Sequence, residues 1–290
     1  MLMRASAPGP SLPPAESRPA ATAASRRPLV LSLFPGIDLL GRAFQAAGYC
    51  VVRGPDTLLD DPIEAWSGTT GFDGVIGGPP CQNYSDANRH RNPDEGDRLL
   101  REFLRIIEES QPTWFMIENV RNIPDVAARG YHVQRLDITD AECGGPQWRL
   151  RHIQFGHRAA LIIRPARTNA ARSVTRCPTL TTAPAGAGDR HVRRCRKQGL
   201  GESLPLRSLT KTARRRVIGN AVPLSIGAAL AAAVSLAGPV TEIDCVCLCG
   251  RRVTPPARHA TAACRKRMER RRREPRRIVA WCGQAAAESP

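Results

Sequence analysis

The most constraining feature of the sequence is an apolar run that stops abruptly. The run covers residues 72–76, and Gly77-Gly78-Pro79-Pro80 separates it from Cys81. The run predicts a buried strand, and the Gly and Pro residues end it. Cys81 is therefore expected at a strand's carboxyl end, facing the crevice where open α/β sheets bind ligands. There it is a candidate nucleophile; the alternative is a small buried hydrophobic side chain, one of ten cysteines.

Strand and helix patterns alternate along residues 28–240. Apolar runs predict strands at 29–34, 49–52, 72–76, 114–117 and 152–155. Amphipathic or apolar spacing predicts helices at 39–47, 99–109 and 224–234. This alternation is typical of an α/β fold with a doubly wound, mostly parallel sheet.

The chain is strongly basic. Its 43 Lys and Arg residues against 26 Asp and Glu give a formal net charge of +17. Such a surplus favours a polyanionic partner, with nucleic acid as the natural candidate, over a small neutral substrate. The alternative is a solvated basic face or a bias toward Arg in the coding genome. We find no apolar run long enough to span a bilayer and no signal peptide, so a cytoplasmic protein with reduced thiols and no membrane partner is expected.

Six short segments resemble, in order, the motifs of the cytosine-5 DNA methyltransferases. They are Leu33-Phe34-Pro35-Gly36-Ile37-Asp38, Pro79-Pro80-Cys81-Gln82, Glu118-Asn119-Val120, Gln147-Trp148-Arg149-Leu150-Arg151, Cys195-Arg196-Lys197-Gln198-Gly199-Leu200 and Gly219-Asn220-Ala221-Val222-Pro223. The resemblance implies a compact, phage-type enzyme, monomeric on DNA, with a Rossmann-like methyltransferase domain at 28–240. Its implied reaction transfers a methyl group from S-adenosylmethionine to C5 of cytosine, as in restriction–modification.

The first strand, turn and helix are expected to bind S-adenosylmethionine. A tight Pro-Gly turn before a helix lets backbone amides approach a ligand closely. Asp38 stands where the family usually has a second glycine, and is expected either to repel the methionine carboxylate or to bind its ammonium group. Asp56 best matches the acid that holds the ribose, with Asp60 or Asp61 as substitutes. The resemblance implies these cofactor-binding residues: Phe34, Pro35, Gly36, Ile37, Asp38, Asp56, Pro80, Asn220 and Ala221.

The resemblance also implies how two neighbouring strand ends share the chemistry. The Cys81 thiolate would add to cytosine C6 and make C5 nucleophilic, with a helix N-terminus or a nearby Arg raising the thiolate fraction. Glu118 would hydrogen-bond or protonate N3, unless it is an ordinary polar residue closing a strand. Arg149 and Arg151 would grip cytosine O2 and a phosphate; ordinary surface arginines are the alternative. The base must rotate out of the duplex, and the residues expected to face DNA are Gln82, Ser85 and Gln147.

Residues 157–177 depart from the family, which inserts a substantial target recognition domain there. About twenty residues cannot build a core of their own. We therefore expect a vestigial recognition region with weak or short sequence specificity, or help from another element. The shortening leaves two alternatives open: an RNA cytosine-5 methyltransferase, and a catalytically decayed protein that only binds DNA.

Both ends of the chain lie outside the resemblance. Residues 1–27 are rich in Pro and Ala and are expected to be disordered. Residues 241–290 predict a small zinc site leading into a basic helix, with unpaired thiols in a disordered tail as the alternative. The expected metal ligands are Cys247, Cys249, His259 and Cys264, with Cys245 as a substitute. The arginines expected to bind DNA phosphates are Arg270, Arg271, Arg272 and Arg273.

Overall fold

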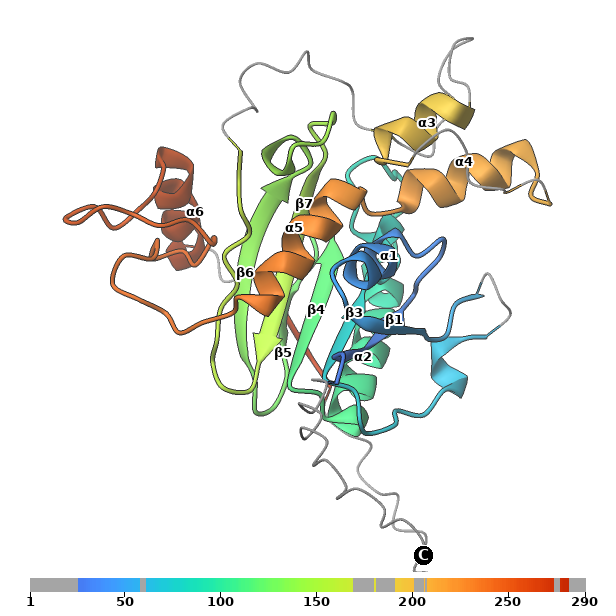
Figure 1. The fold of residues 1–290 in the computed structure, drawn as a ribbon, viewed down its shortest axis with the longest axis horizontal. Coiled ribbons are helices and arrows are strands. Elements are labelled where there is room, and N and C mark those ends of the chain that lie inside the picture. The colour runs from blue at the N-terminus through green and yellow to red at the C-terminus, as the bar shows by residue number, and fades with distance from the viewer. Residues whose placement is uncertain are drawn as a thin grey trace, which may run out of the picture.

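The fold is a six-stranded sheet with helices on both faces (Figure 1). The computed structural model describes residues 26–57, 61–168, 180, 191–200, 206, 208–273 and 277–281, so nearly all of 1–27 lies outside the described residues. The strands are β1 (Leu29–Leu33), β2 (Cys50–Arg53), β3 (Gly74–Gly77), β4 (Trp114–Asn119), β6 (His132–Thr139) and β7 (Leu150–His157). Their order across the sheet is β2-β1-β3-β4-β7-β6, and within this sheet β7 alone is antiparallel. The predicted α/β class with a mostly parallel sheet is confirmed.

Alternating side chains of the central strands fill two apolar layers. Val30 and Ile76 pack on one face with α1 (Leu39–Ala46) and α5 (Leu224–Ser235). Their neighbours in sequence, on the opposite face, pack against α2 (Pro93–Ser110). Because successive residues of a strand point to opposite faces, a continuous apolar run produces a sheet that is buried on both sides. Because β1, β3 and β4 pair in parallel, their carboxyl ends lie together at one edge of the sheet.

Asp38 starts the first helix. It has a left-handed backbone with φ 55°, and its carboxylate accepts hydrogen bonds from the Ser32 hydroxyl at 2.9 Å and the Gly41 amide at 3.0 Å. The side chain is buried, and burial raises its pKa despite these hydrogen bonds. Asp tolerates this conformation and is a preferred N-cap residue. The departure from the family's glycine is therefore a helix cap in this chain.

Several elements were not predicted from the sequence. They are β5 (Asp125–Ala127), β8 (Ile278–Ala280), α3 (His191–Lys197), α4 (Lys211–Asn220), the strand β6, and the 3-10 turns η2 (Ile63–Ala65) and η4 (Ala141–Cys143). The expected basic helix is α6 (Ala262–Arg273). However, β8 pairs in parallel with β5, and Val279 packs in the same layer as α2. The last described strand of the expected tail at 241–290 therefore lies against the main body.

One helical stretch is long and apolar enough to span a membrane by composition. It covers 25 residues, Lys211–Ser235, and 61% of its most apolar window is buried inside the protein. It consists of α4 and α5, and α5 packs against α1 and the sheet through Ile226 and Leu230. The expectation that the chain has no such run was wrong, because a buried core helix has the same hydropathy as a membrane span.

The role of Asp38 as a helix cap predicts different losses of stability for two substitutions. Asp38→Ala removes the acceptor for two buried donors and is expected to lower the free energy of unfolding by about 1–2 kcal/mol, whereas Asp38→Asn keeps an oxygen acceptor and most of that stability. Burial raises the folded-state pKa of Asp38, so this residue's contribution to stability falls as pH rises from its ordinary pKa near 3.9 through the raised value. The Asn variant has no such group to ionise, so its stability gains on that of the parent toward neutral pH. Urea unfolding at several pH values measures both effects; equal losses in Ala and Asn would contradict the cap.

Candidate active site

Cys81 begins a short 3-10 turn, η3 (Cys81–Asn83), directly beyond the carboxyl end of β3. Space for a side chain is limited at Gly77 and Gly78, the two glycines that precede Cys81. A Cβ at Gly77 would lie 2.7 Å from the Leu33 carbonyl oxygen, and one at Gly78 would lie 3.1 Å from Glu118 Oε2. The abrupt Gly-Gly-Pro-Pro ending therefore lets the Cys81 loop pass close to the ends of β1 and β4.

Two buried side chains hold the Cys81 loop. Asn119, at the end of β4, donates from Nδ2 to the Pro79 carbonyl at 2.8 Å. Beyond Cys81, the Tyr84 hydroxyl donates to Asp97 of α2 at 2.8 Å, and Asp97 is also paired with Arg277. The loop is thus tied to a strand on one side of the cysteine and to a helix on the other.

Glu118 and Arg151 form a buried ion pair beside Cys81. Arg151 Nε lies 2.5 Å from Glu118 Oε1, and both side chains are at most 10% exposed. Burial raises the pKa of the Cys81 thiol; the Arg151 and Arg149 charges lower it, and the Glu118 charge raises it. Burial prevails, so the arginines moderate the shift without making Cys81 a thiolate at neutral pH. Antiparallel β7 brings Arg151 to the site, because it lies beside β4 in the sheet.

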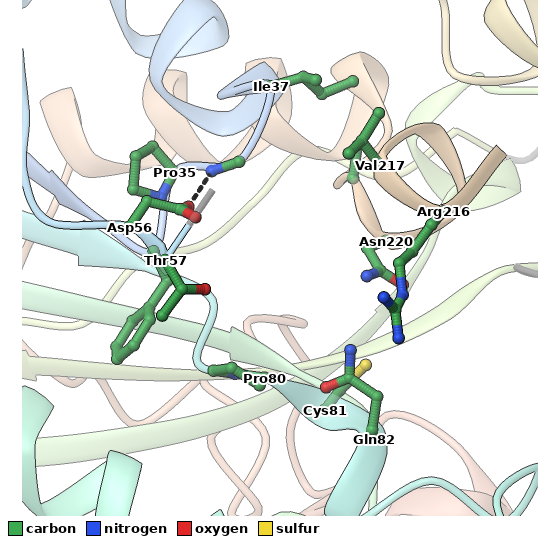
Figure 2. A pocket seen from close by; sticks show the side chains of 13 residues that line it. Pro35, Ile37, Asp56, Thr57, Pro80, Cys81, Gln82, Arg216, Val217 and Asn220 are labelled. Carbon is green, nitrogen blue, oxygen red and sulfur yellow. Dashed lines mark hydrogen bonds between the residues drawn. The ribbon is translucent and has the colours of Figure 1, made fainter. Parts of the chain in front are cut away.

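A cavity of about 250 Å³ opens next to Cys81 (Figure 2). It runs from the turn after β1 to the end of α4. The Asp56 carboxylate lies at one side, where it accepts the Gly36 amide at 2.6 Å. On the opposite side Arg216 extends from α4 toward Gln82 and Cys81. The cavity lining is Phe34, Pro35, Gly36, Ile37, Asp56, Thr57, Pro80, Cys81, Gln82, Arg216, Val217, Asn220 and Ala221.

Most of the expected cofactor residues line this one cavity. Asp38 does not, because its carboxylate caps α1. Of the substitutes for Asp56, Asp61 forms a backbone bridge with Asp56 and Asp60 lies outside the described residues. Sequence reasoning missed Thr57, Val217 and Arg216; the last belongs to a run of arginines at 214–216 that no family motif covers.

Arg149 and Gln147 do not face the cavity, and this corrects the sequence interpretation. The Arg149 guanidinium is buried and donates to the carbonyls of Leu180 at 2.6 Å and Gly219 at 2.8 Å, with a longer contact to Ala221 at 3.4 Å. Gripping cytosine or phosphate is therefore not what this side chain does here. It fastens the α4–α5 connection to β7.

The Gln147 amide is also fully used inside the protein. Its Nε2 donates to the Lys197 carbonyl at 2.5 Å and its Oε1 accepts the Leu180 amide at 2.9 Å. Gln198 continues this network by donating to the Ile218 carbonyl at 2.7 Å. Buried and satisfied, Gln147 cannot contact DNA in this arrangement, so its expected role was wrong.

The remaining expected DNA contacts are separated from one another. Gln82 is exposed and lines the cavity, whereas Ser85 lies in the following turn and accepts the Ala87 amide at 3.3 Å. Arg270 is exposed on α6, and the side chains of Arg271, Arg272 and Arg273 lie outside the described residues. The structure therefore brings together the Cys81 site and the first turn, but places the arginine run on a distant helix (Figure 1).

Four cysteines gather near α6 and could hold a metal ion. They are Cys245, Cys247, Cys249 and Cys264, and His259 is outside this cluster. The expected ligand set needs correction, because the substitute Cys245 takes the place given to His259.

A known family model matches the part of the chain that contains the site. Residues 61–184 match the family model described as C-5 cytosine-specific DNA methylase. Over this region, which is less than half of the chain, the chain is similar to the cytosine-5 DNA methyltransferases. The matched region contains Cys81, Glu118 and Arg151. The family model therefore covers the same residues that the fold brings together at the site.

Curated relatives are similar to part of this chain, and a solved structure shares its fold. Type II methyltransferase M.NgoPII of Neisseria gonorrhoeae is 45% identical over 111 residues, 31% of this chain and 33% of that protein. Type II methyltransferase M.HgiDI of Herpetosiphon aurantiacus is 33% identical over 97 residues, 29% of this chain and 30% of that protein. The matches therefore span about a third of these relatives. The solved structure of Entamoeba histolytica methyltransferase EhMeth shares the fold, with TM-score 0.53 and 12% identity over 71% of this chain and 97% of that one.

The ion pair predicts the pH response of Cys81. Arg151→Ala removes a charge that lowers the pKa of Cys81 and leaves the opposing Glu118 charge unpaired, so the pKa rises further. We expect alkylation of Cys81 by iodoacetamide to slow by roughly tenfold near neutral pH, the factor of one pKa unit, while Arg151→Lys retains most of the rate. Peptide mass spectrometry across a pH series measures the midpoint. An unchanged midpoint in the Ala variant would show that Arg151 does not act on the thiol.

Proposed function

We propose that this protein transfers a methyl group from S-adenosylmethionine to C5 of cytosine in DNA. The observation that carries the proposal is the shared cavity: the turn after β1 and the Cys81 loop line one space, with the Glu118–Arg151 pair beside the cysteine. A cofactor and a base held in this space would meet at Cys81. The type II methyltransferase relatives support a modification role of the restriction–modification kind.

The residues at the first turn fit S-adenosylmethionine, which supplies an electrophilic methyl group on its sulfonium. Gly36 has a positive φ of 56°, and nothing lies within 4 Å of where its Cβ would be, so a ligand can approach the backbone closely. Asp56 offers carboxylate oxygens for ribose hydroxyls, and Arg216 offers a guanidinium for an anionic group across the cavity. Asn220 and Ala221 would close the cavity from the α4–α5 side.

On the base side, Cys81 would act as nucleophile and Glu118 as its acid partner. The thiolate would add to C6, and C5 of the resulting enamine would take the methyl group as its bond to the sulfonium sulfur breaks and S-adenosylhomocysteine leaves. Loss of the C5 proton to water or another base, with elimination of the sulfur, would then release Cys81. A hydrogen bond from Glu118 to N3 would stabilise the charge that develops on the ring. The negative charge of Glu118 raises the pKa of Cys81. When the cytosine ring neutralises that charge, the pKa of Cys81 falls and the thiolate that attacks C6 is favoured.

The target cytosine must leave the helix to reach this half-buried thiol, at a cost of a few kcal/mol. Gln82 is the exposed cavity residue best placed to face the opened duplex. The described part of the shortened region, residues 158–168, packs on the protein itself: Ile162 bridges Gly238, and the Ile163 amide bonds Gln134 at 2.8 Å. We therefore propose weak or short sequence specificity, with duplex affinity supplied by basic surface such as α6.

Transfer of labelled methyl groups from S-adenosylmethionine to unmethylated DNA tests the proposal. The parent chain is expected to label DNA, and Cys81→Ala to lose at least a thousandfold of that activity because no other described group at the cavity replaces the thiolate. Cys50→Ala is the matched control, since this cysteine is exposed and lies away from the cavity. If a matched RNA is labelled and DNA is not, the substrate is RNA. If the protein binds DNA but transfers no methyl group, the proposal that it is an enzyme is contradicted.

A further inference from the structure

The sulfur atoms of four buried cysteines meet away from the candidate active site. The Sγ atoms of Cys245, Cys247, Cys249 and Cys264 all lie within 4.8 Å of one another. Two of the pairs, Cys245–Cys247 and Cys249–Cys264, are 3.4 and 3.7 Å apart. Four sulfurs bound tetrahedrally to zinc at about 2.3 Å would be separated by about 3.8 Å. We propose that these four thiolates bind one structural Zn²⁺ ion.

Backbone turns explain how a Cys-x-Cys-x-Cys spacing forms this cluster. In an extended strand, alternate residues are about 6.6 Å apart, too far to share one ion. Here Leu248 and Gly250 have positive φ values of 52° and 75°, and the Leu248 amide bonds the Cys245 carbonyl at 2.7 Å. A bridge between residues 244 and 252 closes the turn. Cys264 then comes from the first turn of α6 and completes the set.

The surroundings of the sulfurs suit thiolates. The Ala260 amide donates to Cys245 Sγ at 3.4 Å, and the Thr261 hydroxyl donates to Cys264 Sγ at 3.2 Å. The Arg251 guanidinium lies 4.0 Å from Cys264 Sγ. A zinc ion with four thiolates is doubly negative, and hydrogen-bond donors and a cation around the sulfurs stabilise such a centre.

Little apolar material holds this segment together. Among the described residues, the apolar side chains packed around the four cysteines are Val253, Ala260 and Met268. So small a core does not order a segment of this length without a metal or a cross-link. Because protein thiolates fill all four positions, the site has none open for substrate, which identifies a structural and not a catalytic zinc.

The cluster is fastened to the catalytic sheet by charged contacts. Arg251 pairs with Glu142 in the turn after β6. Arg267 of α6 donates to Asp137 Oδ2 on β6 at 2.9 Å, and Asp137 also pairs with His152, the residue after the catalytic-site arginine. Figure 1 shows α6 beside β6, at the side of the sheet away from α1. The zinc ion would therefore fix the basic helix relative to the sheet without touching the methyl-transfer cavity.

Metal analysis of the full-length reduced chain tests the site. We expect one zinc per chain, and near-complete loss of zinc in Cys249→Ser and Cys264→Ser. His259→Ala and Cys50→Ser are the matched controls and are expected to retain one zinc, because neither side chain belongs to the cluster. In the parent chain, Co²⁺ substitution should produce the intense thiolate-to-cobalt absorption band of a tetrathiolate site.

If the Ser variants fail to fold, removing and restoring the metal in the parent chain tests the same site. Removal by a chelator should expose four additional reactive thiols, and zinc should protect them again. Iron in place of zinc, two disulfides in place of free thiols, or loss of zinc in His259→Ala would overturn the proposal. The test is independent of methyl transfer, since zinc content is read without substrate or S-adenosylmethionine.

Discussion

One buried guanidinium joins the two halves of the candidate active site. Arg149 lies directly before β7 and donates to the carbonyls of Leu180 and Gly219, so it fixes the α4–α5 connection over the end of the sheet. That connection supplies Asn220 and Ala221 to the cavity. A buried charge is tolerated here because backbone oxygens satisfy it, and removing it would leave those carbonyls unpaired. The cavity therefore depends on this interaction although Arg149 does not line it.

Arg151, inside β7, acts on the charge of the site and not on the position of its backbone. Arg151 follows Arg149 by two residues, but its side chain lies next to Glu118 and acts on the Cys81 thiol through charge. The Cys81 loop is held separately, by Asn119 and by Tyr84. A nucleophile needs both a fixed position and an adjustable charge environment, and the fold provides these through different side chains.

The sequence predicted the elements whose signal is local and missed those that depend on distant partners. Continuous apolar runs located β1, β3 and β4, and the Gly-Gly-Pro-Pro stop located Cys81. The strand β6 escaped notice because its pattern includes buried Gln134 and Asp137, whose partners lie far along the chain. For the same reason Gln147 and Arg149 were interpreted as DNA contacts. No local pattern shows that a polar side chain will be satisfied by backbone carbonyls from other elements.

The proposed reaction requires that Cys81 become covalently bonded to C6 of a cytosine. A duplex carrying 5-fluorocytosine tests it directly, because fluorine replaces the proton whose loss from C5 would release the enzyme. With S-adenosylmethionine, the account predicts a complex that survives denaturation and whose DNA-linked peptide contains Cys81. Absence of any such complex from a folded protein that binds the duplex, or attachment at another cysteine, would contradict it.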